Sequence, residues 1–271
     1  MLSVISYAGD KYWLLFSAVL SLCLGSFINV VIYRLPAMME NEDKLPLTKP
    51  LNLFLPHSFC PSCLTTLLSR DNVPLFSWLL LRGRCRYCRC RISARYPLIE
   101  LFMMLTGIVL ASYTGIGTDW LFMLLFAALL TALVAIDCHC QLLPDPLTLL
   151  LLWVGLLWHC MEHVSFLPAA IVGAVAGYMT LWLLYWAFRL ATGREGLGYG
   201  DFKLLAALGA WGGYTSLPLI LLFASGGSLI WLALRVLRGT CWSQPLPFGP
   251  GLAVAGAAAV VYQWLILPAD F

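Results

Sequence analysis

The sequence predicts an all-α polytopic membrane protein, with about eight transmembrane helices and a small zinc-binding cytoplasmic domain between the first two spans. Two observations predict the membrane class. Of the 271 residues, 61% are hydrophobic and only 11% are charged, and the mean hydropathy is +0.87. Soluble domains carry about 25% charged residues, so membrane lipid is the expected partner of this surface, and nucleic acid is not. A third observation, two close cysteine pairs in one polar stretch, predicts the zinc-binding domain.

Eight apolar runs are candidates for membrane spans. They cover residues 12–33, 97–114, 119–137, 144–160, 166–190, 201–213, 215–237 and 249–267. We expect the first run to be a retained span, because it lacks the small-residue cleavage site of a signal peptide. The sixth run is short and bounded by glycines, so we expect it to be tilted or partly re-entrant. The predicted domains are the first span (1–33), the polar four-cysteine domain (34–96) and a membrane-embedded domain with two aspartates (97–271).

The distribution of Lys and Arg predicts the orientation. Ten of the sixteen basic residues lie within residues 34–96, so the positive-inside rule places this stretch in the cytoplasm and the N-terminus outside. When the eight spans alternate, the basic residues after the second span all fall on the cytoplasmic side. Only Lys11 lies outside. The same alternation places Asp137 and Asp201 at one interface, the cytoplasmic one.

Asp137 and Asp201 are the candidate catalytic residues. A carboxylate at the centre of a membrane helix costs about 2.5–3.5 kcal/mol on insertion scales, so an acid in such a segment indicates a functional site. Peptide hydrolysis by two carboxyl groups needs one ionised group to activate water and one protonated group to donate a proton. Either acid alone is explained as well by a helix cap or a headgroup contact. The pair on one membrane face favours an aspartyl protease.

Four further residues are candidates for supporting roles. Gly198 and Gly200 precede Asp201, and glycine lets the backbone open at membrane depth and lets an extended peptide approach closely. Asp145 is followed by proline at a helix start, which favours an N-cap of the fourth span, with a supporting role at the site as the alternative. Lys203 lies two positions after Asp201, so on a helix it points elsewhere, as an interfacial anchor or as a charge that biases the pair.

The polar stretch carries the motif Cys-x-x-Cys twice. Cys60 and Cys63 form one pair, Cys85 and Cys88 form the other, and 21 residues separate them. Four thiolates close a tetrahedral structural Zn²⁺ site, which stabilises a domain too small for a large core. A set of reduced cytosolic thiols is the alternative. Cys90 is close enough in sequence to replace Cys88 as a ligand, although it breaks the symmetry of the pairs.

Together these motifs resemble those of the bacterial prepilin peptidases, over almost the whole chain. The resemblance begins with residues 25–31 (GSFINVV) and Arg34-Leu35-Pro36, and it includes both cysteine pairs, with residues 71–74 (DNVP) and Ser77-Trp78 between them. It continues with residues 92–97 (ISARYP) and Glu100. Residues 142–145 (LLPD), followed by Leu147-Thr148, and residues 196–203 (GLGYGDFK) complete it.

The resemblance implies a bifunctional enzyme of a bacterial inner membrane, and the N-terminus, which the charge distribution places outside, is then expected to be periplasmic. It implies that prepilins of type IV pili, or pseudopilins of type II secretion, are the substrates. Their basic leader would be cut after a glycine at the cytoplasmic face, with Asp137 and Asp201 as the catalytic pair. The new N-terminal residue would then be methylated with S-adenosylmethionine. The family ties the polar domain to zinc and to methylation, and Gly83 beside the second cysteine pair is the candidate for close approach of the cofactor.

Two alternative functions remain open from the sequence. A proton-coupled transporter would place acids near the midplane of the membrane, within repeat-related broken helices. A structural component of a secretion machine would dock partners through its zinc domain and would not need either aspartate. A nearer alternative is a di-aspartyl membrane protease of another family, which the cysteine pairs argue against.

Overall fold

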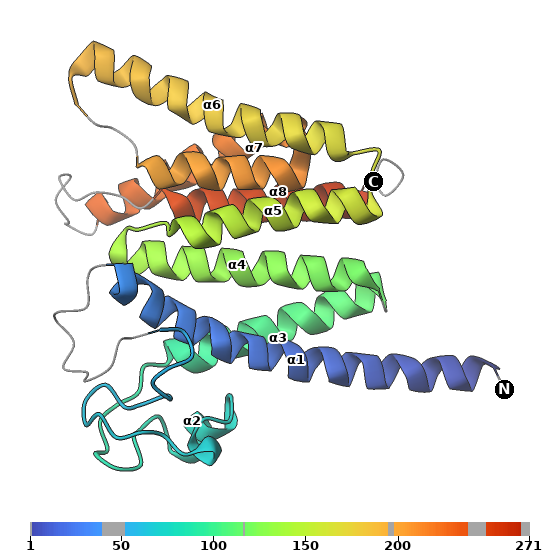
Figure 1. The fold of residues 1–271 in the computed structure, drawn as a ribbon, viewed down its shortest axis with the longest axis vertical. Helices are drawn as coiled ribbons and strands as arrows, with labels where there is room; N and C mark the ends of the chain where they lie inside the picture. The colour runs from blue at the N-terminus through green and yellow to red at the C-terminus, as the bar shows by residue number, and fades with distance from the viewer. Residues whose placement is uncertain (1, 40–51, 116, 195–197, 238–247, 267–271) are drawn as a thin grey trace. The chain divides into compact units, whose positions relative to one another are not determined.

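A computed structural model gives the arrangement of the chain (Figure 1). It describes all residues except 1, 40–51, 116, 195–197, 238–247 and 267–271. The chain divides into two compact units, Met1–Ala132 and Leu133–Phe271. The part of the sequence motif formed by Gly196 and Leu197 lies outside the described residues.

Helices make up nearly all of the regular structure, which confirms the predicted all-α class. They are α1 (Leu2–Met39), the 3-10 turn η2 (Ser69–Asp71), α2 (Phe76–Leu80), α3 (Arg95–Thr114), α4 (Thr118–Cys140), α5 (Asp145–Glu162), α6 (Leu167–Thr192), α7 (Tyr199–Leu237) and α8 (Gly249–Ile266). Within the described residues, β pairing is limited to two isolated bridges, one between Phe59 and Thr66 and one between Arg84 and Arg91.

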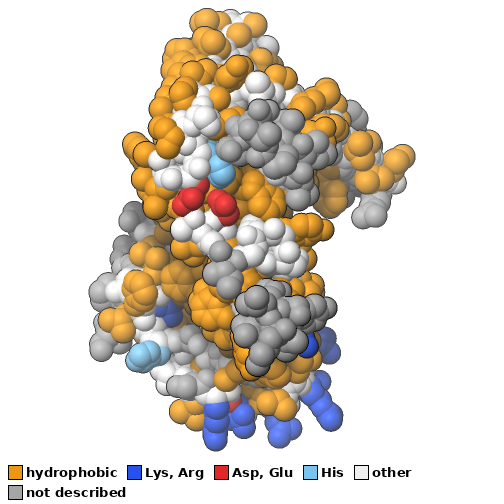
Figure 2. All heavy atoms as spheres, turned by 90° about the vertical axis from the view of Figure 1, so that its right-hand side faces the viewer, with side chains coloured by type: hydrophobic (Ala, Val, Ile, Leu, Met, Phe, Trp, Pro, Cys, Tyr) orange, Lys and Arg blue, Asp and Glu red, His pale blue; other side chains and the backbone are white. Residues whose placement is uncertain are grey.

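Five of the described helices are long and apolar enough to cross a membrane. These segments are Lys11–Met39, Arg95–Thr114, Thr118–Cys140, Leu167–Thr192 and Tyr199–Leu234. Hydrophobic side chains cover much of the surface that Figure 2 shows, while Lys and Arg side chains gather at one edge of it. Leu190, Leu222 and Phe223 are among the large apolar side chains that remain exposed. Large apolar side chains exposed in this way on the helices fit lipid as the surrounding solvent.

Helix α7 contains both the sixth and the seventh predicted spans. The two segments are separated at Gly213, whose backbone is non-helical, with φ 68° and ψ 177°. Glycine is needed there because of the positive φ, and because a Cβ would lie 2.8 Å from the ring of Phe166. The remaining predicted spans coincide with α1, α3, α4, α5, α6 and α8, so the eight predicted segments correspond to seven long helices.

In the first unit, α1 packs closely against α3. The Ser17 hydroxyl donates a buried hydrogen bond of 2.7 Å to the carbonyl of Gly107. A Cβ at Gly107 would overlap the side chain of Ser21, and one at Gly25 would lie 2.9 Å from the Cα of Glu100. Small residues allow helix backbones to approach in a membrane, where hydrophobicity alone does not drive helices together.

Two buried polar residues hold the four-cysteine module, described from residue 52 onward, to these helices. The guanidinium of Arg34, near the end of α1, donates to the carbonyls of Asn52 and Pro56 at 2.8 and 2.6 Å. The carboxylate of Glu100, near the start of α3, accepts the backbone N–H of Leu75 at 2.8 Å. The start and the middle of the module are therefore tied to the helices that flank it.

The second unit packs α7 between α6, α8 and α5. Gly173 of α6 and Gly209 of α7 lie against each other, and a Cβ on either would overlap the other's carbonyl. The indole N–H of Trp211 donates to the carbonyl of Leu151 at 2.9 Å, and Nε2 of His159 lies 3.1 Å from the Trp211 carbonyl. These contacts fix the position of α5 along α7. They therefore also fix the position of the first turn of one helix relative to that of the other.

Candidate functional site

Four helix ends lie on the same side of the second unit. Figure 1 shows the C-terminal end of α4 beside the N-terminal ends of α5, α7 and α8. Leu143, in the connection between α4 and α5, joins them. A Cβ at Gly200 would lie 2.7 Å from the Leu143 Cβ, and one at Gly249 would lie 3.3 Å from its Cδ1. The α4–α5 connection therefore brings the first turns of α7 and α8 against the last turn of α4.

Asp137 lies in the last turn of α4 and is only 5% exposed. Its carboxylate faces the start of α8, where the backbone N–H of Gly249 lies beside it. A Cβ at Gly249 would be 2.6 Å from Oδ2, so only glycine allows this approach. Oδ2 itself is buried and has no hydrogen-bond partner among the described residues. A buried oxygen of this kind fits an acid that binds water, a proton or substrate.

Asp201 lies in the first turn of α7 and is 9% exposed. Its backbone N–H donates to the Gly198 carbonyl at 3.2 Å, and the Gly198 N–H faces its carboxylate. The positive end of a helix stabilises a carboxylate in this position. Gly249, which approaches the Asp137 carboxylate, and Gly200, which directly precedes Asp201, both contact Leu143, so the two acids lie around one side chain. Folding thus brings together the two acids that the sequence singled out.

The glycines before Asp201 differ in their surroundings. Gly200 lies inside the first turn of α7, and its missing side chain leaves the space that Leu143 fills. Gly198 precedes the helix, and a Cβ there would make only an ordinary contact of 3.5 Å with Oδ2 of Asp201. The group that closely approaches Gly200 is therefore Leu143 of this chain. The approach of a peptide at Gly198 stays a prediction.

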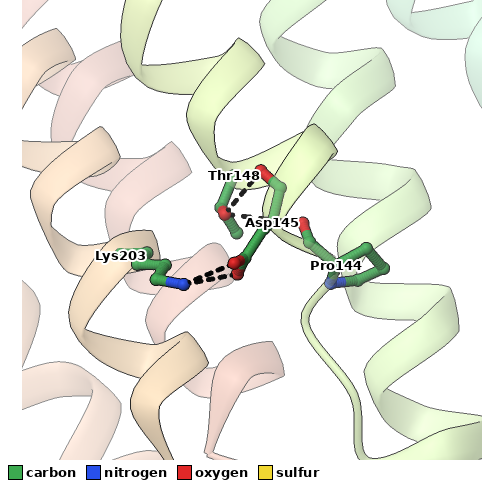
Figure 3. A network of polar contacts seen from close by, with 4 residues as sticks. All are labelled: Pro144, Asp145, Thr148 and Lys203. Carbon is green, nitrogen blue, oxygen red and sulfur yellow. Dashed lines mark hydrogen bonds and ion pairs between the residues drawn. The ribbon is translucent and has the colours of Figure 1, made fainter. Parts of the chain in front are cut away.

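Asp145 and Lys203 bind each other across α5 and α7 (Figure 3). The ammonium of Lys203 lies 2.6 Å from both carboxylate oxygens of Asp145. Helix α5 begins at Asp145 with Pro144 in the N-cap position and no side-chain cap, so the prediction of Asp145 as the N-cap was wrong. The Thr148 hydroxyl instead donates to the carbonyls of this turn. Lys203, from another helix, binds the carboxylate that the local sequence predicted to cap α5.

This ion pair is expected to hold the first turn of α7, and with it Asp201, in place. Lys203→Ala or Asp145→Ala should reduce kcat with little change in KM, by at most about fivefold, since an exposed pair contributes about 0.2–1 kcal/mol. Asp145 and Lys203 are partly exposed, which keeps the expected effect small. The exchanged variant Asp145→Lys with Lys203→Asp should recover most of the loss. An exchanged variant no better than the single ones would contradict a positioning role.

The predicted zinc ligands converge in the first unit. The Sγ atoms of Cys60, Cys63, Cys85 and Cys88 all lie within 4.8 Å of one another, and the Cys60 and Cys88 sulfurs are 3.7 Å apart. A tetrahedral zinc ion with bonds of about 2.3 Å needs sulfurs about 3.8 Å apart, so the four thiols fit this metal. Hydrogen bonds from the side chain and backbone of Thr65 lower the pKa of the Cys63 thiol to about 6, which favours the thiolate that a metal requires.

Gly83 has a structural role beside this cluster. Its φ is +66°, and a Cβ would lie 2.9 Å from the indole ring of Trp78. The Trp78 N–H in turn donates to the Ile92 carbonyl at 3.3 Å. The packing of Trp78 is sufficient to explain why position 83 is a glycine. The approach of a cofactor at Gly83 stays a prediction.

Gly249 and Leu143 also lie at this site and were not predicted from the sequence. Gly249 stands in the run Phe248-Gly249-Pro250-Gly251, directly before the last span. Two glycines around a proline at a helix start are a signal for close backbone approach, similar to the one before Asp201. Leu143 gives no such signal, because an apolar residue beside a helix start is ordinary. Only the folded chain shows that it touches both α7 and α8.

Comparison with known proteins agrees with the motifs. Residues 19–114 match the family model described as the bacterial peptidase A24 N-terminal domain, and residues 123–234 match that of the type IV leader peptidase family. The chain is 49% identical over 265 residues to a prepilin leader peptidase/N-methyltransferase of Aeromonas hydrophila, covering 92% of this chain and 91% of that protein.

Two further relatives have the same name. One from Dickeya chrysanthemi is 48% identical over 270 residues, covering 94% of each chain, and one from Pseudomonas putida is 45% identical over 262 residues, covering 93% and 91%. No solved structure gave a significant match. The relatives are enzymes, and none of these names describes a transporter or a structural component. This chain therefore belongs to the prepilin leader peptidase/N-methyltransferase family and is a multi-pass enzyme of the inner membrane.

Proposed function

We propose that this chain is an aspartic endopeptidase that removes the basic leader of type IV prepilins or type II secretion pseudopilins, cutting after a glycine at the cytoplasmic face. It then methylates the new N-terminal residue. One observation carries the peptidase assignment. Asp137 and Asp201, from the end of α4 and the start of α7, are both buried, and Leu143 contacts the glycine next to each of them, Gly249 and Gly200. Two such carboxyl groups are the minimum that acid–base hydrolysis of a peptide requires.

The two acids divide the chemistry between them. One carboxylate removes a proton from a water molecule, which attacks the scissile carbonyl carbon. The other, protonated, donates a hydrogen bond to the carbonyl oxygen, and a proton then reaches the leaving amine as the C–N bond breaks. Oδ2 of Asp137, buried without a partner in the described residues, is a suitable acceptor for the water proton. A site closed to bulk water strengthens these interactions.

The distribution of charge supports the proposed orientation. We place the N-terminus in the periplasm, and residues 34–96 with ten basic residues in the cytoplasm. The ends of α4, α5, α7 and α8 then lie at the cytoplasmic interface. A prepilin meets this interface where its basic leader stops and its hydrophobic helix begins. The leader would lie in the cytosol and the apolar helix in lipid, between the third, fourth and sixth predicted spans, with the cut site next to the aspartates.

Methyl transfer is assigned to the cytoplasmic module. S-adenosylmethionine, when bound, supplies an activated methyl group to the free amine that cleavage creates. Cys60, Cys63, Cys85 and Cys88 would hold a structural zinc ion, which crosslinks two loops that share little apolar core. The module is predicted to span residues 34–96, between the first span (1–33) and the peptidase domain (97–271).

Mass spectrometry of a co-expressed prepilin tests both activities at once. We expect the mature product to lack its leader and to carry one methyl group on its new N-terminal residue. A mature product without the methyl group would contradict the transferase assignment and leave the peptidase assignment intact. A prepilin that keeps its leader in the presence of the parent enzyme, while a relative processes it, would contradict the peptidase assignment.

A further inference from the structure

The two cysteine pairs form two turns of the same design. In the first turn, the N–H of Cys60 donates to the Thr65 carbonyl, and the N–H of Leu64 donates to the Cys60 carbonyl, at 3.0 and 2.8 Å. In the second, the N–H of Cys85 donates to the Cys90 carbonyl, and the N–H of Arg89 donates to the Cys85 carbonyl, at 2.9 and 3.0 Å. An isolated bridge closes each turn. Thr65 and Cys90 therefore occupy equivalent positions.

The residue at this position reaches the metal cluster in both turns. Thr65 hydrogen-bonds with Cys63, the second cysteine of its own turn. The Cys90 side chain likewise interacts with Cys88, and its sulfur also lies 3.5 Å from the sulfur of Cys60. That distance is close to the edge of about 3.8 Å expected between two thiolates on one zinc ion. Unlike threonine, cysteine at this position offers a metal ligand.

The five thiols differ in exposure. Cys60 and Cys85 are buried, Cys63 and Cys90 are half-buried, and Cys88 is exposed. Cys88 is therefore the ligand most accessible to water, to competing chelators and to thiol reagents. Cys90 lies beside it on the more protected side, in hydrogen-bond contact with both Cys88 and Cys60. A ligand lost at Cys88 would leave a coordination position next to the Cys90 thiol.

We propose that Cys90 is a fifth thiol of the zinc centre, which replaces Cys88 as the fourth ligand when Cys88 is detached. In the exchange, the bond between zinc and the Cys88 sulfur breaks and a bond to the Cys90 sulfur forms. The proton that Cys90 loses passes to Cys88, so the charge of the four-thiolate site is unchanged. Cys60, Cys63 and Cys85 stay bound throughout. The inference rests on the proposed zinc centre and extends it to a residue outside the two pairs.

The repeated turns supply a matched test of this role. Zinc content is measured on the full-length enzyme in detergent, for Cys88→Ser and for Cys63→Ser, which removes the equivalent ligand of the first turn. Cys88→Ser should keep about one zinc ion per chain, because Cys90 takes its place. Cys63→Ser should lose most of its zinc, because Thr65 offers no thiolate and Cys90 replaces only Cys88, which is still bound in this variant. The double variant Cys88→Ser with Cys90→Ser should lose zinc as Cys63→Ser does.

Two further measurements make the result decisive. The cobalt(II) form of Cys88→Ser should retain the absorption of a four-thiolate site, and Cys63→Ser with Thr65→Cys should regain zinc. Equal zinc loss in Cys88→Ser and Cys63→Ser, or a three-thiolate cobalt spectrum in Cys88→Ser, would overturn the role of Cys90. Full zinc content in the double variant as well would instead contradict the four-cysteine centre on which the inference rests.

Discussion

Replacement of Asp137 or Asp201 by asparagine is expected to abolish leader cleavage. Asparagine keeps the size of the side chain but can neither accept the proton of the attacking water nor donate a proton as a carboxylic acid. General acid–base groups typically contribute about 10²–10⁴-fold to a rate. The cleavage rate of each single variant should therefore fall by at least about 10²-fold. Because the two acids act as a unit, the double variant should be no slower than the single ones. Single-turnover cleavage of a purified prepilin measures this.

Asp119→Asn is the matched control for Asp137→Asn. Asp119 lies in the first turn of the same helix, 18 positions before Asp137 and therefore about 27 Å away along its axis. The variant Asp119→Asn should leave the cleavage rate unchanged. If either Asp137→Asn or Asp201→Asn still processes a prepilin at the parental rate, the assignment of the pair is wrong. If the double variant loses far more activity than either single one, the two acids act independently.

The sequence was sufficient to predict the helical fold, and the placement of both aspartates at the cytoplasmic interface stays a prediction. Long apolar runs show where helices cross a membrane, and the alternation of basic residues predicted that the two acids share one interface. The structure agrees in placing the end of α4 beside the start of α7. The break in α7 was also visible, because predicted spans ended at Gly213 and began again two residues later.

The features that the sequence did not reveal depend on tertiary contacts. Gly249, at the start of α8, lies against both Asp137 and Leu143, which are far from it in the sequence. Asp145 has the local signature of a helix cap, but Lys203, distant in sequence, binds its carboxylate instead. The two cysteine turns are alike because they have the same backbone hydrogen bonds. The residues that make these bonds, such as Thr65 and Cys90, are of unrelated types. Periodicity and short motifs contain no information about such partners.

The metal site and the aspartates belong to different compact units, and this separation carries a functional consequence. Cys60, Cys63, Cys85 and Cys88 lie in residues 1–132, whereas Asp137, Asp201 and the contacts described around them lie in residues 133–271. Loss of zinc should therefore affect methylation far more than cleavage. The two steps of the proposed reaction sequence would then have separate structural requirements within one chain.

Cys60→Ser with Cys63→Ser is expected to release zinc and to abolish methylation, while most of the leader cleavage is retained. Zinc binding in small four-ligand modules contributes about 10–16 kcal/mol, far more than the core of residues 52–94 could replace. The module should become sensitive to protease and exchange its amide protons quickly. Zinc analysis, hydrogen exchange and mass spectrometry of the processed prepilin measure the three effects.

Cys23→Ser with Cys160→Ser is the control, because it removes two thiols that lie outside the cluster, in α1 and α5. It should keep zinc and both activities. Unchanged zinc content in Cys60→Ser with Cys63→Ser would exclude this ligand set. Loss of cleavage to the same extent as loss of methylation would mean that the module also positions the prepilin for the aspartates. Its arginine-rich surface would then have to act on the substrate before the peptide bond is cut.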